Sequence, residues 1–444
     1  MLDGRKKICY TLYIIKCRLI NKGGILIKFL IVPKPILAKD MTLHGYVFRH
    51  QQAHDYVADA PARLFDGVVT LPGLKILEDI GLEAFTGGAP LFVPINVFSL
   101  LSDISLQCSQ PPEKIVFLLD NNIPPEMVYI DCIQKLKEKG FRFAIENVSN
   151  FEHMDSIVQL CDYIILGFRF NNLRNLDVYR KIAVKYRNHT FIASEVNSTE
   201  TFLRLENSGF DFFEGRFYNL PISKEKTMMS PVKINRIQLL NTVREEEFAV
   251  EEVVKIVSRD PSMSISLLKL VNSPHLGISQ KIKNIQHAVA MIGQKEVRKW
   301  VTTVISSLLS EDKPSELTRL SLLRAKFAEN LSTSFELGMQ ANDLFMMGLF
   351  SVLDVALEMP MNKALELIKV ADEIREVLVN GTGRFMPVLE LLLSYESANW
   401  TATKNIMAIH HVPAEKVFAA YIDTVKWYDS VMTMTVSADE EEAE

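Results

Sequence analysis

Short apolar runs alternate with helical patterns between residues 41 and 220. Between the second and third runs, apolar residues from Met127 to Leu136 recur at helical spacing, and Gly140 follows at the expected helix end. The runs are continuous rather than alternating, as in buried parallel strands; they occupy residues 91–96, 114–119, 142–146, 162–168, 190–195 and 210–217. This strand and helix repeat predicts an α/β barrel of the TIM-like kind.

The strand pattern disappears after "NLPISKEKTMMSPVKINR", where two prolines and a run of mixed charge indicate a domain boundary. Beyond it, apolar residues such as Phe248, Val253 and Val257 recur at helical spacing. Asp260 and Pro261 fit the N-cap and first position of a further helix. We therefore predict a barrel domain over residues 41–222, an all-α helical domain over residues 223–435 and an acidic tail over residues 436–444.

The first forty residues are rich in Lys, Arg and aliphatic residues and have almost no acids. Their apolar runs stop at Lys16 or are interrupted by Lys28 and Pro33, well short of the roughly 20 residues that a membrane-spanning helix needs. We predict that residues 1–40 are a basic extension outside the fold, or translated sequence upstream of a start at Met41. A segment that lies on a membrane surface is the alternative.

Composition narrows the class of protein. The net charge of -5 over 444 residues provides no basic stripe for nucleic acid, so we expect no nucleic-acid partner. The five cysteines are an odd number without paired spacing or a histidine cluster, and predict neither a disulfide framework nor a zinc site. We expect a cytoplasmic protein without a cofactor.

The active sites of α/β barrels are built at the C-terminal ends of the strands. A barrel that held divalent metal for phosphodiester hydrolysis would need several converging oxygen ligands there, and this rim has few. Arg216, with Phe217 and Tyr218, could instead hold a nucleotide by charge and stacking; the alternative is that the two aromatic residues pack the barrel and Arg216 is solvated. The candidate residual ligand-binding residues are Asn96, Glu146, Asn147, Glu195, Glu214 and Arg216.

Several stretches resemble one known family. "GYVFRHQQAHD", "GLEAFTGGAPLFVPI", "LKEKGFRFAIENV" and "GFDFFEGRFYNLP" are similar to framework motifs of EAL domains. "RDPSMSISLLKLVNSPHLGISQKIKNIQHAVAMIGQKEVRKW", "MGLFSVLDVALEMPM" and "LLSYESANW" are similar to HDOD domains. From Met41 to about residue 430, the chain resembles bacterial EAL-HDOD signalling proteins, in which a cyclic di-GMP phosphodiesterase-type EAL barrel precedes a helical HDOD domain.

The chemical residues of this resemblance are mostly missing. Active EAL domains carry two aspartates where this chain has Glu146 and Asn147. The other metal-site and catalytic positions fall on Pro61, Pro94 or Asn96, Leu118, Ile165, Gly167, and Ser194 or Asn197. Since each lost carboxylate removes negative charge that would offset a divalent cation, we predict no metal site and no phosphodiesterase activity.

The helical domain also lacks the metal dyad of the related HD phosphohydrolases. None of its histidines precedes an aspartate; they are His275, His287, His410 and His411. The only His-Asp dipeptide, His54-Asp55, lies in the first domain. The resemblance therefore implies a non-enzymatic regulator that serves as a protein-interaction platform for a kinase or response regulator, in control of motility or biofilm. A cyclic di-GMP-binding sensor, or a residual phosphodiesterase that uses the barrel rim, is the alternative.

Overall fold

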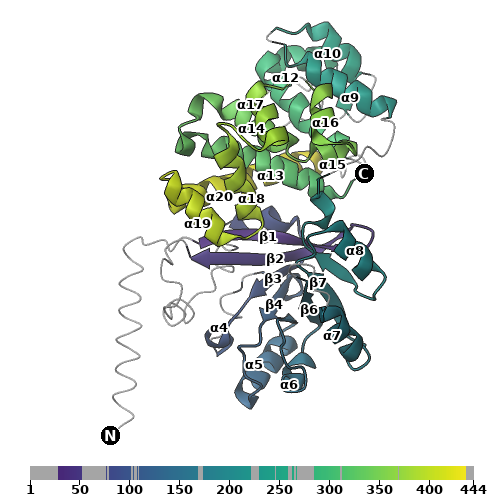
Figure 1. Cartoon of the computed structure of the whole chain (residues 1–444), viewed down its shortest axis with the longest axis vertical. Helices are drawn as coiled ribbons and strands as arrows, with labels where there is room; N and C mark the ends of the chain where they lie inside the picture. The colour runs from purple at the N-terminus through teal and green to yellow at the C-terminus, as the bar shows by residue number, and fades with distance from the viewer. Residues whose placement is uncertain are drawn as a thin grey trace.

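The computed structural model consists of a barrel followed by a helical domain (Figure 1). The described residues are 29–52, 77, 80–101, 104, 108, 110–168, 174–221, 230–245, 247–258, 263, 264, 267, 285–310, 313–368 and 370–436. The predictions for His54, Asp55, Pro61, Asp260, Pro261, His275 and residues 437–444 lie outside the described residues. None of the helices in the described part is both long and apolar enough to cross a membrane.

Eight strands close into a barrel in chain order, with β8 beside β1. They are β1 (Phe29–Ala38), β2 (Leu43–Gln52), β3 (Leu91–Pro94), β4 (Ile115–Leu119), β5 (Arg142–Glu146), β6 (Tyr163–Gly167), β7 (Thr190–Ser194) and β8 (Phe212–Glu214). β1 is antiparallel to both of its neighbours, and the other neighbouring strands are parallel. The barrel helices are α3 (Leu82–Thr86), α4 (Val97–Leu101), α5 (Met127–Glu138), α6 (Asp155–Val158), α7 (Arg174–Ile182) and α8 (Thr199–Glu206). The predicted α/β barrel is confirmed, and each of the six predicted apolar runs contains a strand.

The prediction that residues 1–40 lie outside the fold is wrong for β1. This strand pairs with β2 along most of its length and with β8 at Ile36 to Ala38. β1 contains Pro33 and Pro35, which have no backbone N–H to donate, and both are tolerated because of the side to which their nitrogens point. The backbone N–H of Ile31 donates to the Tyr395 hydroxyl at 3.2 Å, away from β2. Pro33 and Pro35 share this orientation because strand geometry repeats every two residues, so their missing N–H groups break no pairing with β2.

An apolar plug fills the interior of the barrel. It consists of Ile36, Val47, Phe92, Val116, Leu118, Ala144, Tyr163, Ile165 and Ile192, with Phe212 packed against it. Near the strand starts, the His44 ring stacks on Phe212 with 3.7 Å between ring centroids. Burial first, and then the charge of Arg142, lower the pKa of His44 to about 4. The barrel is thus a packed core, and chemistry is confined to its rim.

The helical domain follows a boundary near Pro231. Its helices are α9 (Pro231–Thr242), α10 (Val250–Val257), α12 (Ile285–Leu309), α13 (Ser315–Leu331), α14 (Ala341–Phe350), α15 (Leu353–Leu357), α16 (Met361–Leu367), α17 (Asp372–Arg375), α18 (Met386–Glu396), α19 (Trp400–Ile409) and α20 (Ala414–Val436). α13 and α14 pack closely at Gly348, where a Cβ atom would lie 2.5 Å from the backbone of Arg324. The all-α second domain is therefore confirmed.

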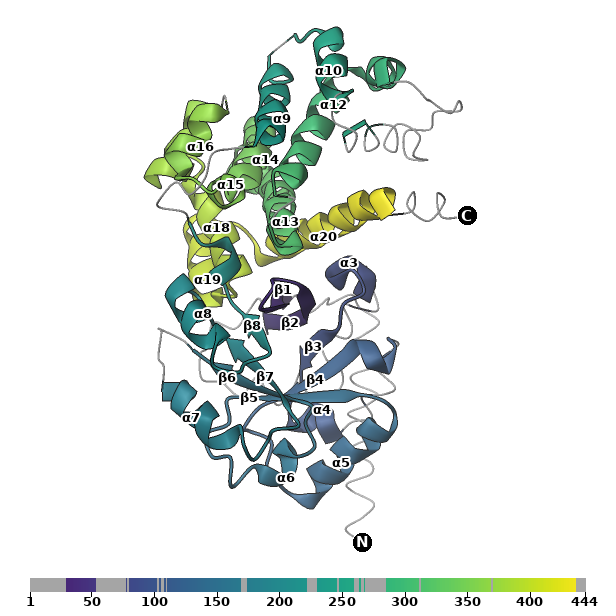
Figure 2. The ribbon, with the colours of Figure 1, turned by 90° about the vertical axis from the view of Figure 1, so that its right-hand side faces the viewer.

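The helical domain covers the outer face of β1 and β2 (Figures 1 and 2). A tight turn joins these two strands, so no helix between them covers this side of the barrel. Helices α18 and α20 contact β1 instead, and α20 also contacts α3. Two hydrogen bonds cross the boundary from α13: the Tyr46 hydroxyl donates to Glu316, and Arg319 donates to the Phe85 carbonyl at 2.7 Å. The second domain therefore completes the outer layer of the barrel.

Candidate functional site at the barrel rim

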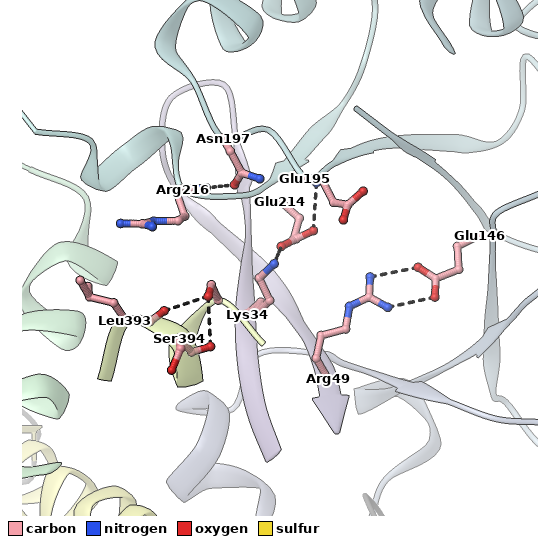
Figure 3. A network of polar contacts seen from close by, with 10 residues as sticks. Lys34, Arg49, Glu146, Glu195, Asn197, Glu214, Arg216, Leu393 and Ser394 are labelled. Atoms are coloured by element: carbon pink, nitrogen blue, oxygen red, sulfur yellow. Dashed lines mark hydrogen bonds and ion pairs between the residues drawn. The ribbon is translucent and has the colours of Figure 1, made fainter. Parts of the chain in front are cut away.

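Four charged side chains gather at the rim, from strands that are distant in the sequence (Figure 3). They are Lys34 on β1, Arg49 on β2, Glu146 on β5 and Glu214 on β8. Each lies two positions along its strand from a residue of the apolar plug or packed against it. Because side chains alternate between the two faces of a strand, each therefore points to the inside of the barrel. The plug forms the floor of this charged layer.

Arg49 and Glu146 form a bidentate ion pair. The two guanidinium nitrogens donate to the two carboxylate oxygens at 2.9 and 3.0 Å. The side chains are only 25% and 15% exposed, so solvent screens the pair incompletely. Burial alone would lower the pKa of Arg49, but Glu146, and then Glu214 and Glu195, raise the pKa well above its usual range. Arg49 is thus the positive charge that the carboxylates of Glu146, Glu195 and Glu214 share.

Lys34 and Glu214 form a second, more deeply buried ion pair. The ammonium nitrogen lies 2.5 Å from a carboxylate oxygen, and the Glu214 side chain is 2% exposed. The backbone N–H of Glu195 donates to the other oxygen of Glu214 at 3.2 Å. Burial would raise the pKa of Glu214, but Lys34 and then Arg49 outweigh it and hold the pKa below its usual value. Glu214 is therefore ionised at neutral pH, with its charge balanced within the protein.

Asn147 and Glu195 occupy the first positions after β5 and β7, and both adopt left-handed backbone conformations, with φ of 58° and 59°. This conformation is uncommon for residues other than glycine and ends the strands sharply. Asn147 is exposed beside the Arg49–Glu146 pair. The Glu195 carboxylate lies over Gly167, where an added Cβ would be 3.4 Å from its oxygen. At the end of β5, Glu146 is thus held in the ion pair with Arg49, whereas the next residue, Asn147, is exposed.

The rim includes only some of the predicted site residues. Glu146, Glu195 and Glu214 surround Arg49 as expected of neighbours at the strand ends. Asn96 instead accepts hydrogen bonds from the backbone and hydroxyl of Ser99 at 2.9 and 3.0 Å, at the start of α4. The Arg216 side chain points away from Glu195 and Glu146, toward the helical domain (Figure 3).

The positions assigned by resemblance also have clear places. Leu118 and Ile165 belong to the apolar plug, with 2% and 3% exposure, and supply no ligand atoms. Pro94 and Gly167 end β3 and β6. Pro61 lies outside the described residues; the strand that pairs with β3 on this side is β2, and its rim residue is Arg49. Sequence reasoning missed Lys34 and Arg49 because their strands were not predicted; the alternation of Val47 with Arg49 was the available signal.

The rim residues as placed do not fit a divalent cation. Such an ion needs several oxygen ligands, whereas both oxygens of Glu146 already accept from Arg49. One oxygen of Glu214 pairs with Lys34, and the other accepts from the backbone N–H of Glu195. Within the described residues, no group of three or more His, Cys, Asp or Glu side chains is arranged to hold a metal ion. At the rim, Arg49 pairs with Glu146 and Lys34 pairs with Glu214, so the charges of these carboxylates are balanced within the protein.

Comparisons with known proteins identify the second domain. Residues 229–376 match the family model of the HDOD domain. The uncharacterised protein YuxH of Bacillus subtilis is 26% identical over 409 residues, which cover 90% of this chain and 98% of YuxH. The cyclic di-GMP phosphodiesterase CdgJ of Vibrio cholerae is 25% identical over 73% of this chain and 76% of CdgJ. The FimX EAL domain of Pseudomonas aeruginosa bound to c-di-GMP has a TM-score of 0.33 and 17% identity, over 44% of this chain and 90% of that domain.

The HDOD match, the closed barrel that precedes it and the similarity to CdgJ support the resemblance to EAL-HDOD proteins. The chain combines a closed eight-stranded barrel with an HDOD domain.

Proposed function

We propose that this chain is a non-enzymatic signalling regulator in a cyclic di-GMP-related system, and that its barrel serves as a protein-interaction platform. The observation that carries the proposal is the pairing at the rim: Arg49 holds Glu146 and Lys34 holds Glu214. Cationic side chains thus bind the oxygens that a metal ion would have to take as ligands. The resemblance extends the proposal to control of motility or biofilm through a kinase or response regulator in the cytoplasm.

The energetics support an inactive barrel. Metal-dependent hydrolysis of a phosphodiester uses the ion to activate water and to stabilise charge on the phosphate. To admit an ion here, Glu214 would have to leave Lys34, and the Lys34 ammonium, whose side chain is only 15% exposed, would lose its counter-charge and face a second cation. Leu118 and Ile165, which belong to the plug, offer no replacement ligand. Metal binding would therefore start from a large energetic disadvantage.

A cyclic di-GMP sensor, or a residual phosphodiesterase, is the second candidate. The relative CdgJ is named as a cyclic di-GMP phosphodiesterase. Arg49 and Lys34 could also turn from their carboxylates to the phosphates of a dinucleotide, because guanidinium and ammonium groups bind both kinds of anion. This candidate needs no metal for binding and differs from the first in having a ligand.

The test is turnover and binding of labelled cyclic di-GMP by the purified full chain with Mg²⁺ or Mn²⁺. We expect no turnover in the wild type. Saturable binding without turnover would favour the sensor. Metal-dependent turnover that is lost in Glu146→Ala, but kept in the matched control Glu152→Ala, would refute the main proposal; Glu152 is an exposed acid in the loop after β5.

A further inference from the structure

A cavity of about 70 Å³ lies between the two domains, beside the barrel rim. β1 and the segment from Gly215 to Asn219 form its barrel side, and α13, α18 and α20 form its other side. A single water needs roughly 10–15 Å³ measured in the same way. The cavity therefore has room for several waters or for a polyatomic ligand, and it exists only where the two domains meet.

The wall of this cavity has an excess of positive charge. Three of its four cations have carboxylate partners, in the pairs Lys34–Glu214 at 2.5 Å, Arg319–Glu316 at 3.7 Å and Arg324–Glu396 at 2.5 Å. The fourth is Arg216, whose backbone N–H donates to the Asn197 side chain at 3.1 Å. Its guanidinium has no carboxylate partner within the described part of the chain. One positive charge on the wall thus lacks a counter-ion.

Two polar atoms on the barrel side of the cavity are buried without hydrogen-bond partners among the described residues. They are Nε of Arg216 and Oδ1 of Asn219, and Asn219 as a whole is only 8% exposed. Buried polar groups in native proteins are nearly always paired, and an unpaired one calls for a water, an ion or a ligand. The two atoms therefore leave hydrogen-bonding capacity unused in the residues that line the cavity.

The tyrosines of the wall add hydrogen-bond donors. Burial raises the pKa of the Tyr218 and Tyr421 hydroxyls well above the ordinary value, so both stay protonated at neutral pH. The Tyr395 hydroxyl already accepts from the backbone N–H of Ile31, which leaves its own hydrogen to be donated. A wall that combines one free guanidinium with hydroxyl donors is complementary to an anion with several acceptor oxygens.

We propose that this interdomain cavity binds a small oxyanion of about the size of phosphate, held by Arg216 and by the hydroxyls of Tyr218 and Tyr421. A protonated oxygen of monohydrogen phosphate could also donate to Oδ1 of Asn219. The ligand would contact the barrel through Arg216 and the helical domain through Tyr421, so its binding would hold the two domains together. The Arg216 side chain points away from Glu146 and Glu195 (Figure 3), and the cavity adjoins the rim at Lys34, the partner of Glu214.

The test is calorimetric titration of inorganic phosphate into the full chain, with ionic strength held constant by chloride. We expect one saturable site per chain, and Arg216→Gln should weaken it at least about tenfold. The matched control is Arg180→Gln, which alters an arginine with a 67% exposed side chain and should leave the affinity unchanged. The absence of saturable binding to the wild type, or equal affinities for the two variants, would overturn the proposal.

If circular dichroism shows that Arg216→Gln is misfolded, a second variant still tests the proposal. Tyr421→Phe removes one hydroxyl and keeps the ring, so the fold should persist while phosphate affinity falls by about three- to tenfold. Phosphate should also raise the melting temperature of the wild type more than that of Tyr421→Phe, because a ligand that binds only the folded protein stabilises it. Unchanged affinity and an unchanged melting response in Tyr421→Phe would again overturn the site.

Discussion

Replacing Lys34 with methionine should destabilise the protein strongly, because it leaves Glu214 as a buried charge. The Lys34 and Glu214 side chains are 15% and 2% exposed, and their charged atoms lie 2.5 Å apart. Removing one partner of a buried pair typically costs about 3–5 kcal/mol. Arg49 and the N–H of Glu195 still favour the ionised Glu214, so we expect a loss near the lower end, about 3 kcal/mol.

The same variant should have a distinctive pH dependence. In the wild type the pKa of Glu214 lies below its usual value of 4.5. Its stabilising contribution is therefore present above pH 4.5 and is lost as the pH falls through the folded-state pKa. Without Lys34, burial should dominate and raise the pKa of Glu214, so protonation relieves the buried charge. The stability gap between wild type and Lys34→Met should consequently narrow from neutral pH toward about pH 5.

Urea unfolding of the full chain, followed by circular dichroism at both pH values, measures this gap. Arg204→Gln is the control, because its ion pair with Glu200 joins side chains that are 55% and 70% exposed and should contribute at most about 0.5 kcal/mol. Adding Glu214→Leu to Lys34→Met should restore much of the stability. The reasoning is refuted if Lys34→Met costs no more than Arg204→Gln, or if the gap stays constant with pH.

Two substitutions and one titration test other parts of the fold. Tyr46→Phe removes a hydrogen bond to the buried Glu316 across the domain boundary and should cost about 1–3 kcal/mol in urea unfolding; a neutral effect would contradict a packed boundary. The His44 ring should titrate near 4 rather than 6.5 by NMR. Because its folded-state pKa is lowered, stability should fall as pH drops from 6.5 toward 4; a ring midpoint near 6.5 would refute its burial. Gly215→Ala places a Cβ atom 2.1 Å from the Val196 carbonyl, so a fall in melting temperature is expected, and an unchanged value would be inconsistent with this close approach.

The strand pattern predicted the parallel part of the barrel well but not its first two strands. β3 to β8 are apolar runs because both of their faces are buried, and continuous apolar runs are easy to locate. β1 contains Pro33, Pro35 and Lys34, which argue against a strand unless its antiparallel position is known. β2 mixes His, Gly, Arg and Gln with apolar residues, because one of its faces meets the helical domain and the other reaches the rim.

The sequence predicted the carboxylates of the candidate site but not their cationic partners, because the partners lie on the two strands that were not predicted. Strand ends indicated Glu146, Glu195 and Glu214, but their cations come from the two unpredicted strands, and Arg49 is 97 residues from Glu146. Pairings across such a distance depend on closure of the barrel, which local pattern does not encode. Arg216 follows β8 and was expected at the rim, yet its side chain points toward the helical domain.

The measurement that tests the central claim most directly is electron paramagnetic resonance of Mn²⁺ titrated into the full chain, with and without cyclic di-GMP. If Arg49 and Lys34 hold the rim carboxylates, Mn²⁺ should stay free in solution in both series. A stoichiometric bound Mn²⁺ signal that disappears in Glu146→Ala would contradict the account, because it would place a metal ion on an oxygen assigned here to Arg49.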